Sequence, residues 1–597
     1  MNESSKLTHI QKGIDEMELY MERYHAWLNS PNVDPDTKAE LEALQNDTDE
    51  IAFRFSSYME FGTGGLRSKM GAGTGMMNNY TVAQATEGLA RMIDSLGDEA
   101  KARGVVIGYD SRHHSNDFAR RSAEVLTAHG IRVYLFDALR PTPCLSAGVR
   151  YFGAIAGINI TASHNPSQYN GYKLYWEDGA QPTAQMADKV SALILSADIL
   201  NDVPAPDKAD WNLVTMVGRD FDEMYLESLL KEQVYPGLVE KAAEQLKIVY
   251  TPLFGAGAKL VPEIMKRIGA KYIYPVEEQM APNGAFPGLA KPNPEYPASF
   301  ALGIELAEKV QSDLIIATDP DADRVGVMAR DKSGVFQCIN GNQMGSLLLD
   351  YIFNALEEQG AMPADAYCVK TIVTSEMATA ICKAHGVELY NVLTGFKFIA
   401  EVIREHEEAG HGTYLLGYEE SYGYLKGGHA RDKDAVVASM LICEMAAYYS
   451  LKGMTLIDAL NALYEKYGYF SENAAEIYME GLDGKAAIAG MMDALRAKTP
   501  EEIGGSAVVN FRDYEAETSL DLRTGKTEPT GLPKSNVLYY AMENGCVVVA
   551  RPSGTEPKIK FYILACGKDS GEAAANTAAC TASLEALLGL EKGSLKK

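Results

Sequence analysis

Five short apolar runs, separated by stretches of helical composition, set the strongest limit on how this chain can fold. The runs are continuous in hydrophobic residues, a pattern typical of strands that are covered on both faces. Strands and helices in alternation predict parallel α/β layers, in which ligands gather at the carboxyl ends of the strands. The runs are GVVIGYD (104–110), IRVYLFD (131–137), AIAGINI (154–160), KIVYTPL (247–253) and DLIIATD (313–319).

The two ends of the chain depart from this pattern. Residues 1–50 have the apolar spacing and the Asp cap of helices, which predicts a helical extension packed on the first domain. After residue 505 the strands shorten and one alanine-rich helix follows, which indicates a smaller α+β domain with an antiparallel sheet. A chain of 597 residues is too long for one core, so we expect three to five domains. The segments 196–211 and 466–474 are the candidate linkers.

Charge limits the classes of partner. The formal net charge is −26, from 55 basic and 81 acidic residues, and no basic stripe stands out. A surface this acidic is a poor binder of nucleic acid or of anionic membranes, so we expect neither as a partner. A small anionic ligand would need a pocket with its own local positive charge.

Cysteine usage and the start of the chain indicate a compartment. The eight cysteines form no CxxC or CxH cluster, which is typical of free thiols in a reducing environment. The first twenty residues are polar and carry acids, unlike a signal or transit peptide. No apolar run approaches the length of a membrane span. We therefore expect a soluble, cytoplasmic protein.

The stretch NITASHNPSQYNGYKLYW, residues 159–176, places a serine and a histidine where an apolar run gives way to polar residues. One interpretation is a turn, because Asn165-Pro166 forms turns in any protein. The other is a nucleophile, Ser163, held at a strand end with His164 beside it as a proton carrier. The pair by itself does not decide between them.

The stretch ATDPDADRVGV, residues 317–327, places Asp319, Asp321 and Asp323 at the end of another apolar run. Three converging carboxylates need a cation among them, and oxygen ligands alone select Mg²⁺ or Ca²⁺. An EF-hand is excluded because its sixth position would be Arg324 instead of glycine. The alternative is an acidic surface turn. Arg324 favours the metal site, since it would pair with a phosphate that the metal also contacts.

The stretch RPSGTEPKIK, residues 551–560, has the composition of an anion site. Arg551 supplies a guanidinium fork, Ser553 and Thr555 supply hydroxyls, and Gly554 lets backbone amides approach an anion. This segment would provide the local positive charge that the acidic chain otherwise lacks. The alternative is a Pro-Gly turn in a small domain.

A loop rich in glycine and tyrosine, within residues 415–436, carries Glu419, Glu420 and Ser421. These side chains would offer hydrogen-bond partners to sugar hydroxyls. Paired glutamates are more often a solvated face, so the loop carries little weight in isolation.

Together and in this order, the four segments resemble the α-D-phosphohexomutases over roughly residues 50 to 597. The matching segments are 161–166 (phosphoserine loop), 319–324 (metal loop), 417–421 (sugar-binding loop) and 551–558 (phosphate-binding loop). The resemblance implies three successive mixed α/β sandwich domains and a C-terminal α+β domain with a mainly antiparallel sheet, around a central cleft. The expected division is 1–50 (helical extension), 51–205 (phosphoserine domain), 206–336 (metal domain), 337–467 (sugar domain) and 468–597 (phosphate domain).

The same resemblance implies a mechanism. Ser163 would rest as phosphoserine, with Mg²⁺ held by Ser163, Asp319, Asp321 and Asp323, and glucose 1,6-bisphosphate would be the intermediate and activator. Arg67 and Lys173 match basic residues near the transferring phosphoryl group, and either Lys173 or His164 would handle the hydroxyl proton. The implied substrate-binding residues are Arg324, Lys397, Glu419, Ser421, Arg551, Ser553, Gly554, Thr555 and Lys558.

The expected substrate is a small phosphosugar. Lys397 and Tyr422 stand where members that also accept mannose carry histidines, which favours a phosphoglucomutase interconverting glucose 1-phosphate and glucose 6-phosphate. GYEESYGY, RDKDAV and the N-terminal extension resemble the longer branch of the family, which includes phosphopentomutases. A phosphopentomutase or a phosphomannomutase is therefore the alternative, and a monomer or weak homodimer is expected.

Two interpretations from other classes are less favoured. A non-catalytic phosphosugar-binding protein would be expected to have lost Ser163 or one of the aspartates, and all are present. A phosphatase with Asp319 as its nucleophile would need threonine or valine at the position of Asp323.

Overall fold

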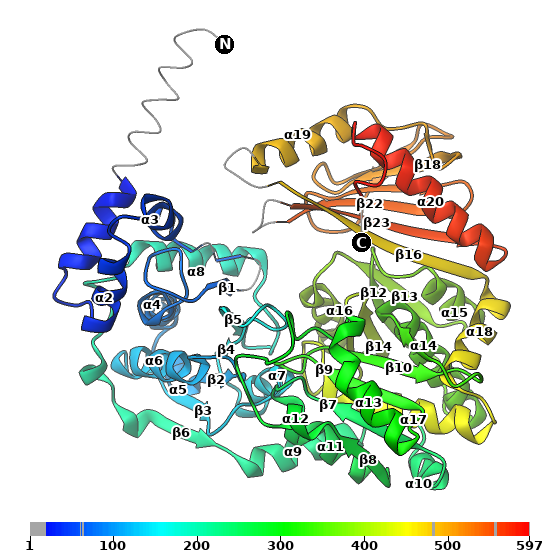
Figure 1. Cartoon of the computed structure of the whole chain (residues 1–597), viewed down its shortest axis with the longest axis horizontal. Helices are drawn as coiled ribbons and strands as arrows, with labels where there is room; N and C mark the ends of the chain where they lie inside the picture. The colour runs from blue at the N-terminus through cyan, green and yellow to red at the C-terminus, as the bar shows by residue number, and fades with distance from the viewer. Residues whose placement is uncertain (1–18, 60, 63–64, 480–483, 554–557, 596–597) are drawn as a thin grey trace.

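The computed structural model describes residues 19–595 except 60, 63–64, 480–483 and 554–557. This part of the chain forms four β-sheets in chain order, with helices packed against them (Figure 1). The first three sheets contain parallel strands, and the fourth is antiparallel throughout. The predicted fold class, three α/β units followed by an antiparallel C-terminal unit, is confirmed.

The first sheet has six strands, most of them buried. Its strands are β1 (Gly65–Lys69), β2 (Val105–Tyr109), β3 (Val133–Phe136), β4 (Ala156–Ile160), β5 (Tyr169–Trp176) and β6 (Val214–Val217), and its helices are α4 (Asn79–Leu96), α5 (Asp98–Arg103), α6 (Ser115–Ala128), α7 (Thr142–Phe152) and α8 (Ala184–Ser196). The strand order is β1-β5-β4-β2-β3-β6. Every residue of β2 and β4 is buried, as their continuous apolar sequences predict.

The last strand of this sheet lies beyond the expected end of the first domain. β6 pairs in parallel with β3, so the first sheet extends past the predicted boundary at residue 205. The polar segment before it, which suggests a linker, contains the short 3₁₀ turns Pro206–Lys208 and Trp211–Leu213. Strand pairing across the sheet decides the membership of β6, and local composition does not reveal that pairing.

The N-terminal helices pack on the first sheet's domain. Residues 19–29 are helical, and α2 (Pro35–Ala43) and α3 (Thr48–Phe55) follow. Trp27 and Phe55 share a small hydrophobic core with Ala72 and Ile199, which belong to the first domain. Shared burial of these apolar side chains holds the extension in place.

The second sheet has five strands in the order β11-β10-β9-β7-β8. Its strands are β7 (Lys247–Thr251), β8 (Tyr272–Pro275), β9 (Leu314–Thr318), β10 (Val325–Arg330) and β11 (Phe336–Ile339), and its helices are α9 (Arg219–Leu230), α10 (Leu238–Ala242), α11 (Gly257–Arg267), α12 (Glu277–Met280), the 3₁₀ turn Pro297–Phe300 and α13 (Ala301–Val310). β9 and β10 form an antiparallel pair. Their connection is the segment with the three aspartates.

The third sheet has four strands in the order β13-β12-β14-β15. Its strands are β12 (Ala366–Thr371), β13 (Glu388–Val392), β14 (Thr413–Glu419) and β15 (Gly423–Leu425), and its helices are α14 (Gly341–Glu358), α15 (Met377–His385), α16 (Phe396–Ala409), α17 (Ala435–Leu451) and α18 (Leu456–Tyr467). One hydrophobic core cluster contains Val106, Ile248 and Leu416, one from each of the first three sheets. This shared core fixes the three sheets relative to one another.

The fourth sheet has a core of its own. Its strands are β16 (Tyr469–Tyr478), β17 (Glu502–Ile503), β18 (Ser506–Asp513), β19 (Thr518–Asp521), β20 (Thr527–Pro529), β21 (Leu538–Met542), β22 (Val547–Pro552) and β23 (Lys558–Gly567), and its helices are α19 (Gly484–Ala497) and α20 (Ser570–Leu587). A second, smaller cluster packs Val549 and Tyr562 of this sheet against Ile372 and Leu393 of the third domain. The C-terminal domain therefore contacts its neighbour through a limited apolar patch.

Among the described residues, no single helix is both long enough and apolar enough to span a membrane. The consecutive helices α17 and α18 reach that length and apolar composition only when taken together, and the chain bends by 82° between them.

A half-buried histidine joins two helices of the first domain and leads to a pH prediction. His129, just after α6, contacts two acidic residues of α4: Glu87 (Nε2 to Oε2, 2.9 Å) and Asp94 (Nδ1 to Oδ2, 2.7 Å). The hydrogen bond to Glu87, aided by Asp94 and opposed by burial, raises the pKa of His129. Its stabilising contribution is therefore complete below the unfolded-state pKa of about 6.5 and is lost as the pH rises through the folded-state value.

We expect His129→Gln to lower the melting temperature at about pH 6, through a loss of order 1 kcal/mol, and to have little effect at about pH 9. The measurement is thermal unfolding of both proteins across this range. His25→Gln, at an exposed position, is the control and should show no such pH dependence. An equal effect of His129→Gln at both ends of the range would contradict the assignment.

Candidate active site

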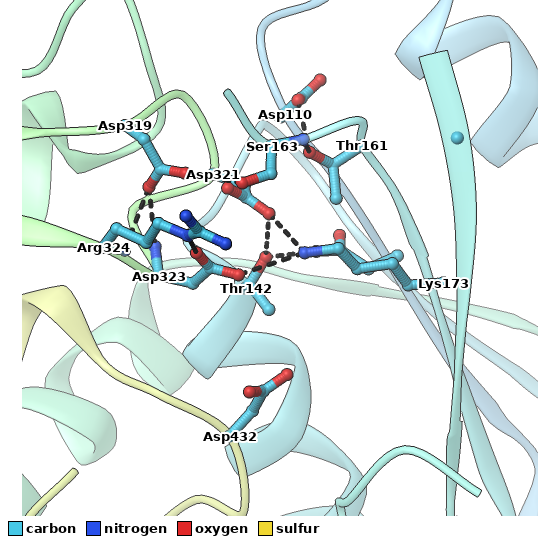
Figure 2. Close-up of polar contacts among 12 residues, drawn as sticks. Asp110, Thr142, Thr161, Ser163, Lys173, Asp319, Asp321, Asp323, Arg324 and Asp432 are labelled. Carbon is cyan, nitrogen blue, oxygen red and sulfur yellow. Dashed lines mark hydrogen bonds and ion pairs between the residues drawn. The ribbon is translucent and has the colours of Figure 1, made fainter. Parts of the chain in front are cut away.

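Ser163 and the three aspartates come from different sheets and meet at the carboxyl ends of β4 and β9 (Figure 2). Ser163 Oγ donates a hydrogen bond to Asp319 Oδ2 at 2.7 Å, across 156 positions of sequence. All four side chains are buried. The burial does not fit an acidic surface turn, which was the alternative for the aspartate loop. The serine loop does turn at residues 163–164, but with the serine buried against Asp319.

The serine loop has a tightly defined local structure. Ser163 adopts a left-handed backbone with φ of 51°, and its N–H donates to Thr161 Oγ1 at 2.8 Å. The hydroxyl of Thr161 in turn donates to Asp110 at 2.6 Å. Gly171 on β5 is required here, because a Cβ at that position would lie 2.5 Å from the carbonyl oxygen of Thr161. The loop therefore packs directly on the neighbouring strand.

The aspartate loop turns between β9 and β10. Asp319 Oδ1 accepts the backbone N–H groups of Asp323 (3.1 Å) and Arg324 (3.0 Å), which closes the turn around its own carboxylate. Gly255 lets a second loop approach, since a Cβ there would lie 2.4 Å from the Cα of Pro320. The alternation of aspartates seen in the sequence thus directs all three side chains to one point.

The three carboxylates form a group that can hold a metal ion. One oxygen from each of Asp319, Asp321 and Asp323 lies within 4.8 Å of the other two. The Oδ1 atoms of Asp321 and Asp323 are buried and have no hydrogen-bond partner in the described part of the chain. Buried carboxylate oxygens without donors are costly, and a hard cation that prefers oxygen ligands would satisfy them. The residues present fit such a cation.

Two lysines balance the negative charge. Figure 2 shows the Lys173 ammonium directed at Asp321 (2.7 Å) and Asp323 (3.1 Å). Lys433 Nζ lies 3.0 Å from Asp323. Burial, with the charges of the other two aspartates, raises the pKa of Asp319 well above its usual range. Burial also opposes ionisation of Asp323, but Lys173 and Lys433 outweigh it and lower its pKa.

His164 and Arg67 also lie near the serine loop. His164 Nδ1 is 3.2 Å from Ser163 Oγ. Burial, with the positive charges of Arg324 and Arg67, lowers the pKa of His164 well below its usual range, so its ring is neutral. Arg67 donates to the side chain of Asn165 at 3.2 Å. Burial also opposes the charge on Lys173, but Asp321 and Asp323 outweigh it and raise the pKa of that ammonium.

Sequence reasoning missed four residues of this site. Thr142, the first residue of α7, donates its hydroxyl to Asp321 at 2.8 Å and its N–H to the Asp321 carbonyl at 2.7 Å. Lys433 and Asp432 pair at 3.1 Å, and Tyr175 donates to Asp432 at 2.7 Å. A signal existed for Lys433, since RDKDAV stands out in the sequence, but only the fold places it beside Asp323.

The predicted sugar-binding residues gather at the carboxyl end of β14. Glu419 is buried, and its Oε1 accepts the N–H of Gly395 at 3.0 Å, beside Lys397 at the start of α16. Ser421 is half-buried. Burial, together with the charge of Glu419, raises the pKa of Glu420 to about 7.

This loop reaches the aspartate loop through the backbone. The N–H of Val325 donates to the carbonyl of Tyr422 at 3.2 Å. Arg324 donates to Glu295 at 2.6 Å, which orients its guanidinium beside Asp323. The loops of the second and third domains are thus in direct contact beside the aspartates.

The predicted phosphate-binding residues lie on the C-terminal domain. Arg551 is near the end of β22, and Lys558 begins β23, which pairs with it. The N–H of Ser553 donates to the Lys558 carbonyl at 2.8 Å. Val549 and Tyr562, from the same two strands, pack against Ile372 and Leu393, so this strand pair lies beside the third domain. Gly554 and Thr555 lie outside the described residues.

Comparison with known protein families gives three matches in chain order. They are described as phosphoglucomutase/phosphomannomutase alpha/beta/alpha domains I, II and III, and they cover residues 58–199, 223–334 and 340–467. Together these matches span more than half of the chain. The aspartate loop falls within the second match and the serine loop within the first.

Curated relatives extend the similarity. The chain is 37% identical over 507 residues to a phosphoglucomutase of Staphylococcus epidermidis, covering 85% of this chain and 90% of that protein. It is also 37% identical over 511 residues to a phosphoglucomutase of Staphylococcus aureus, with the same coverage.

Solved structures share the fold. A phosphoglucomutase/phosphomannomutase family protein from Burkholderia thailandensis matches with a TM-score of 0.62 at 17% identity, over 88% of this chain and 97% of that chain. The open form of parafusin, a phosphoglucomutase from Paramecium, matches with a TM-score of 0.64 at 17% identity, over 89% of this chain and 95% of that chain.

Proposed function

The chain belongs to the phosphoglucomutase/phosphomannomutase family, and on that premise we propose that it is a phosphoglucomutase interconverting glucose 1-phosphate and glucose 6-phosphate. The observation that carries the proposal is the 2.7 Å contact of the Ser163 hydroxyl with Asp319 inside a buried group of three carboxylates. A hydroxyl in that position is suited to carry a phosphoryl group. The similarity to relatives named phosphoglucomutase supports the choice of sugar.

Ser163 is the proposed carrier of the phosphoryl group. A hydroxyl of the sugar monophosphate attacks the phosphorus of phosphoserine, the bond from phosphorus to Ser163 Oγ breaks, and glucose 1,6-bisphosphate forms. After the bisphosphate turns around, Ser163 Oγ takes back the phosphoryl group from the other position, which releases the isomeric monophosphate. The proton of the attacking hydroxyl goes to a base in the site. His164 and Lys173 are the candidates, and the raised pKa of Lys173 favours His164, whose ring is neutral.

Asp319, Asp321 and Asp323, with an oxygen on Ser163, are the proposed Mg²⁺ ligands, and the orphaned carboxylate oxygens support this set. Bound Mg²⁺ would withdraw charge from the transferring phosphoryl group, which is most of what phosphoryl transfer requires of a protein. Lys173 keeps two of these carboxylates in place and adds positive charge beside them. Arg67 adds a further positive charge near Ser163.

The four predicted domains each contribute one loop to this proposal, with the ranges 51–205, 206–336, 337–467 and 468–597. The family matches, at residues 58–199, 223–334 and 340–467, fall inside the first three of these ranges, whereas β6 of the first sheet lies beyond residue 205. The proposed ligands of the sugar and its non-reacting phosphate are Arg324, Lys397, Glu419, Ser421, Arg551, Ser553, Gly554, Thr555 and Lys558. Arg551, Ser553, Gly554 and Thr555 form the proposed phosphate clamp, the site of the non-reacting phosphate. One such site is needed because the bisphosphate places a phosphate there in both of its orientations.

A cytoplasmic location is also part of the proposal. All eight cysteines lie at described positions and are free thiols, most of them buried. Free thiols are typical of a reducing compartment.

The proposal is tested by a Mg²⁺-dependent mutase assay on glucose 1-phosphate, mannose 1-phosphate, glucosamine 1-phosphate and ribose 1-phosphate, each with and without glucose 1,6-bisphosphate. We expect kcat/KM for glucose 1-phosphate to exceed that for the other three sugars by at least about tenfold. A site whose buried polar groups bind particular sugar hydroxyls discriminates strongly against sugars that place those hydroxyls differently. A lead for ribose 1-phosphate would keep Ser163 and the aspartates in their roles and assign the protein to phosphopentose chemistry. Turnover of none of the four would contradict a phosphosugar mutase.

A further inference from the structure

We propose that Arg112 is a positioning residue for phosphoryl transfer, whose guanidinium holds the backbone of the serine loop so that Ser163 faces the three carboxylates. The inference rests on the proposed function, because it concerns the reaction of Ser163. Arg112 lies in the segment after β2, the strand next to β4 in the first sheet. The ends of parallel neighbours meet at one edge, which brings this residue under the serine loop.

One guanidinium binds four carbonyl groups of the loop. Arg112 Nη1 donates to the carbonyls of Pro166 (2.9 Å) and Tyr169 (3.0 Å). Arg112 Nη2 donates to the carbonyls of Ser163 and Asn165. Hydrogen bonds from a charged donor are stronger than neutral ones, and these four span the loop from Ser163 to the start of β5. The side chain is fully buried.

Asp110 joins the guanidinium to the other side of the same loop. Arg112 Nε lies 3.3 Å from Asp110 Oδ2, and the same oxygen accepts the hydroxyl of Thr161. Thr161 then accepts the N–H of Ser163. The serine is therefore held at its N–H through Asp110 and Thr161, and at its carbonyl through Arg112.

These contacts at the N–H and at the carbonyl of Ser163 explain how the residue keeps an unfavourable backbone conformation. A left-handed conformation is unfavourable for a residue other than glycine, and it persists only where the surroundings fix it. With φ of 51°, Ser163 points its hydroxyl at Asp319. Without the guanidinium, one buried and three half-buried carbonyls would lose this donor, and the loop would be free to relax to a conformation in which Oγ turns away.

A residue of the second domain packs against the guanidinium of Arg112. The ring centre of Phe286, a buried residue of that domain, lies 5.0 Å from Arg112 Cζ. The described hydrogen bonds, ion pair and ring contact of Arg112 are with the loop carbonyls, Asp110 and this ring, and not with the Ser163 hydroxyl, so Arg112 is a positioning residue. The serine loop is thus set against the domain that carries the aspartates.

The test uses three full-length variants, Arg112→Met, Arg112→Lys and Arg140→Met. Arg140 is an equally buried arginine paired with Asp222, and it serves as the matched control for loss of a buried ion pair. Dephosphorylated enzyme is mixed with glucose 1,6-bisphosphate, and phosphate uptake on Ser163 is followed in a single turnover by intact-protein mass spectrometry. Steady-state kcat and KM and the melting temperature are measured alongside.

We expect Arg112→Met to slow single-turnover uptake and kcat by about 10²-fold, as a misplacement of about 1 Å can do, with KM changed less than about threefold. Arg112→Lys should recover part of the rate, and Arg140→Met should lower the melting temperature while uptake stays within about threefold of wild type. Uptake by a folded Arg112→Met within about threefold of wild type would overturn the inference. If Arg112→Met does not fold, Arg112→Lys is judged by the same limits, and loss of fold in both assigns Arg112 to stability alone. Failure of wild type itself to take up phosphate would instead overturn the proposed function.

Discussion

Ser163→Ala is expected to lower mutase kcat by at least about 10⁴-fold, because a nucleophile that carries the transferred group has no substitute in the site. The Oγ atom of Ser163 makes the side-chain contacts with Asp319 and His164, and alanine lacks this atom. Its removal leaves the clamp and the sugar loop intact, so glucose 6-phosphate should still bind with an affinity within about threefold of wild type. Turnover is measured by kcat, binding by calorimetry, and phosphoserine by intact-protein mass.

The control is Ser312→Ala. Ser312 is also buried and hydrogen-bonded, but it lies at the opposite end of β9 from Asp319. We expect its kcat to stay within about threefold of wild type, with some loss of thermal stability. Retained phosphorylation and turnover in Ser163→Ala would show that another residue carries the phosphoryl group.

Removal of divalent metal is expected to lower kcat by about 10³-fold or more, the equivalent of the several kcal/mol that a cation contributes to a phosphoryl transition state. Adding Mg²⁺ should restore the rate of wild type. In Asp321→Asn the loss should persist at saturating Mg²⁺, because one of three buried ligand oxygens is replaced by an amide. Kinetics after chelation and after Mg²⁺ addition provide the measurement.

Thermal unfolding gives a readout independent of activity. Mg²⁺ should raise the melting temperature of wild type, since a ligand that binds only the folded state stabilises it, and should leave Asp321→Asn unchanged. Asp313→Asn is the control, because Asp313 is an exposed acid just before β9 and far from the loop along the strand. Full activity of wild type in chelator would refute a metal role for the three aspartates.

The fold was predictable where the pattern is local. Continuous apolar runs such as residues 104–110 and 313–319 contain buried strands, because a strand covered on both faces has apolar side chains on both faces. The place of β6 was not predictable, since its pairing with β3 links residues far apart in the chain. Register and strand membership depend on what lies beside a strand, and four residues of sequence do not encode that.

The site divides in the same way. Ser163, Asp319, Asp321 and Asp323 were identifiable because each follows an apolar run, and the carboxyl ends of such strands collect ligands. Arg112 also follows one, yet nothing local separates it from an ordinary surface arginine.

The sequence alone determined the layered α/β architecture and the antiparallel C-terminal unit, and it predicted four candidate loops, because hydrophobic periodicity and side-chain type are properties of short segments. Only the tertiary structure decided which charges meet. Lys433 reaches Asp323 and Arg112 holds Ser163 because separate segments pack into shared buried space. In that space a charged side chain is stable only beside a group of opposite charge. The packing of whole domains, and not the sequence next to the charged residue, determines which group that is.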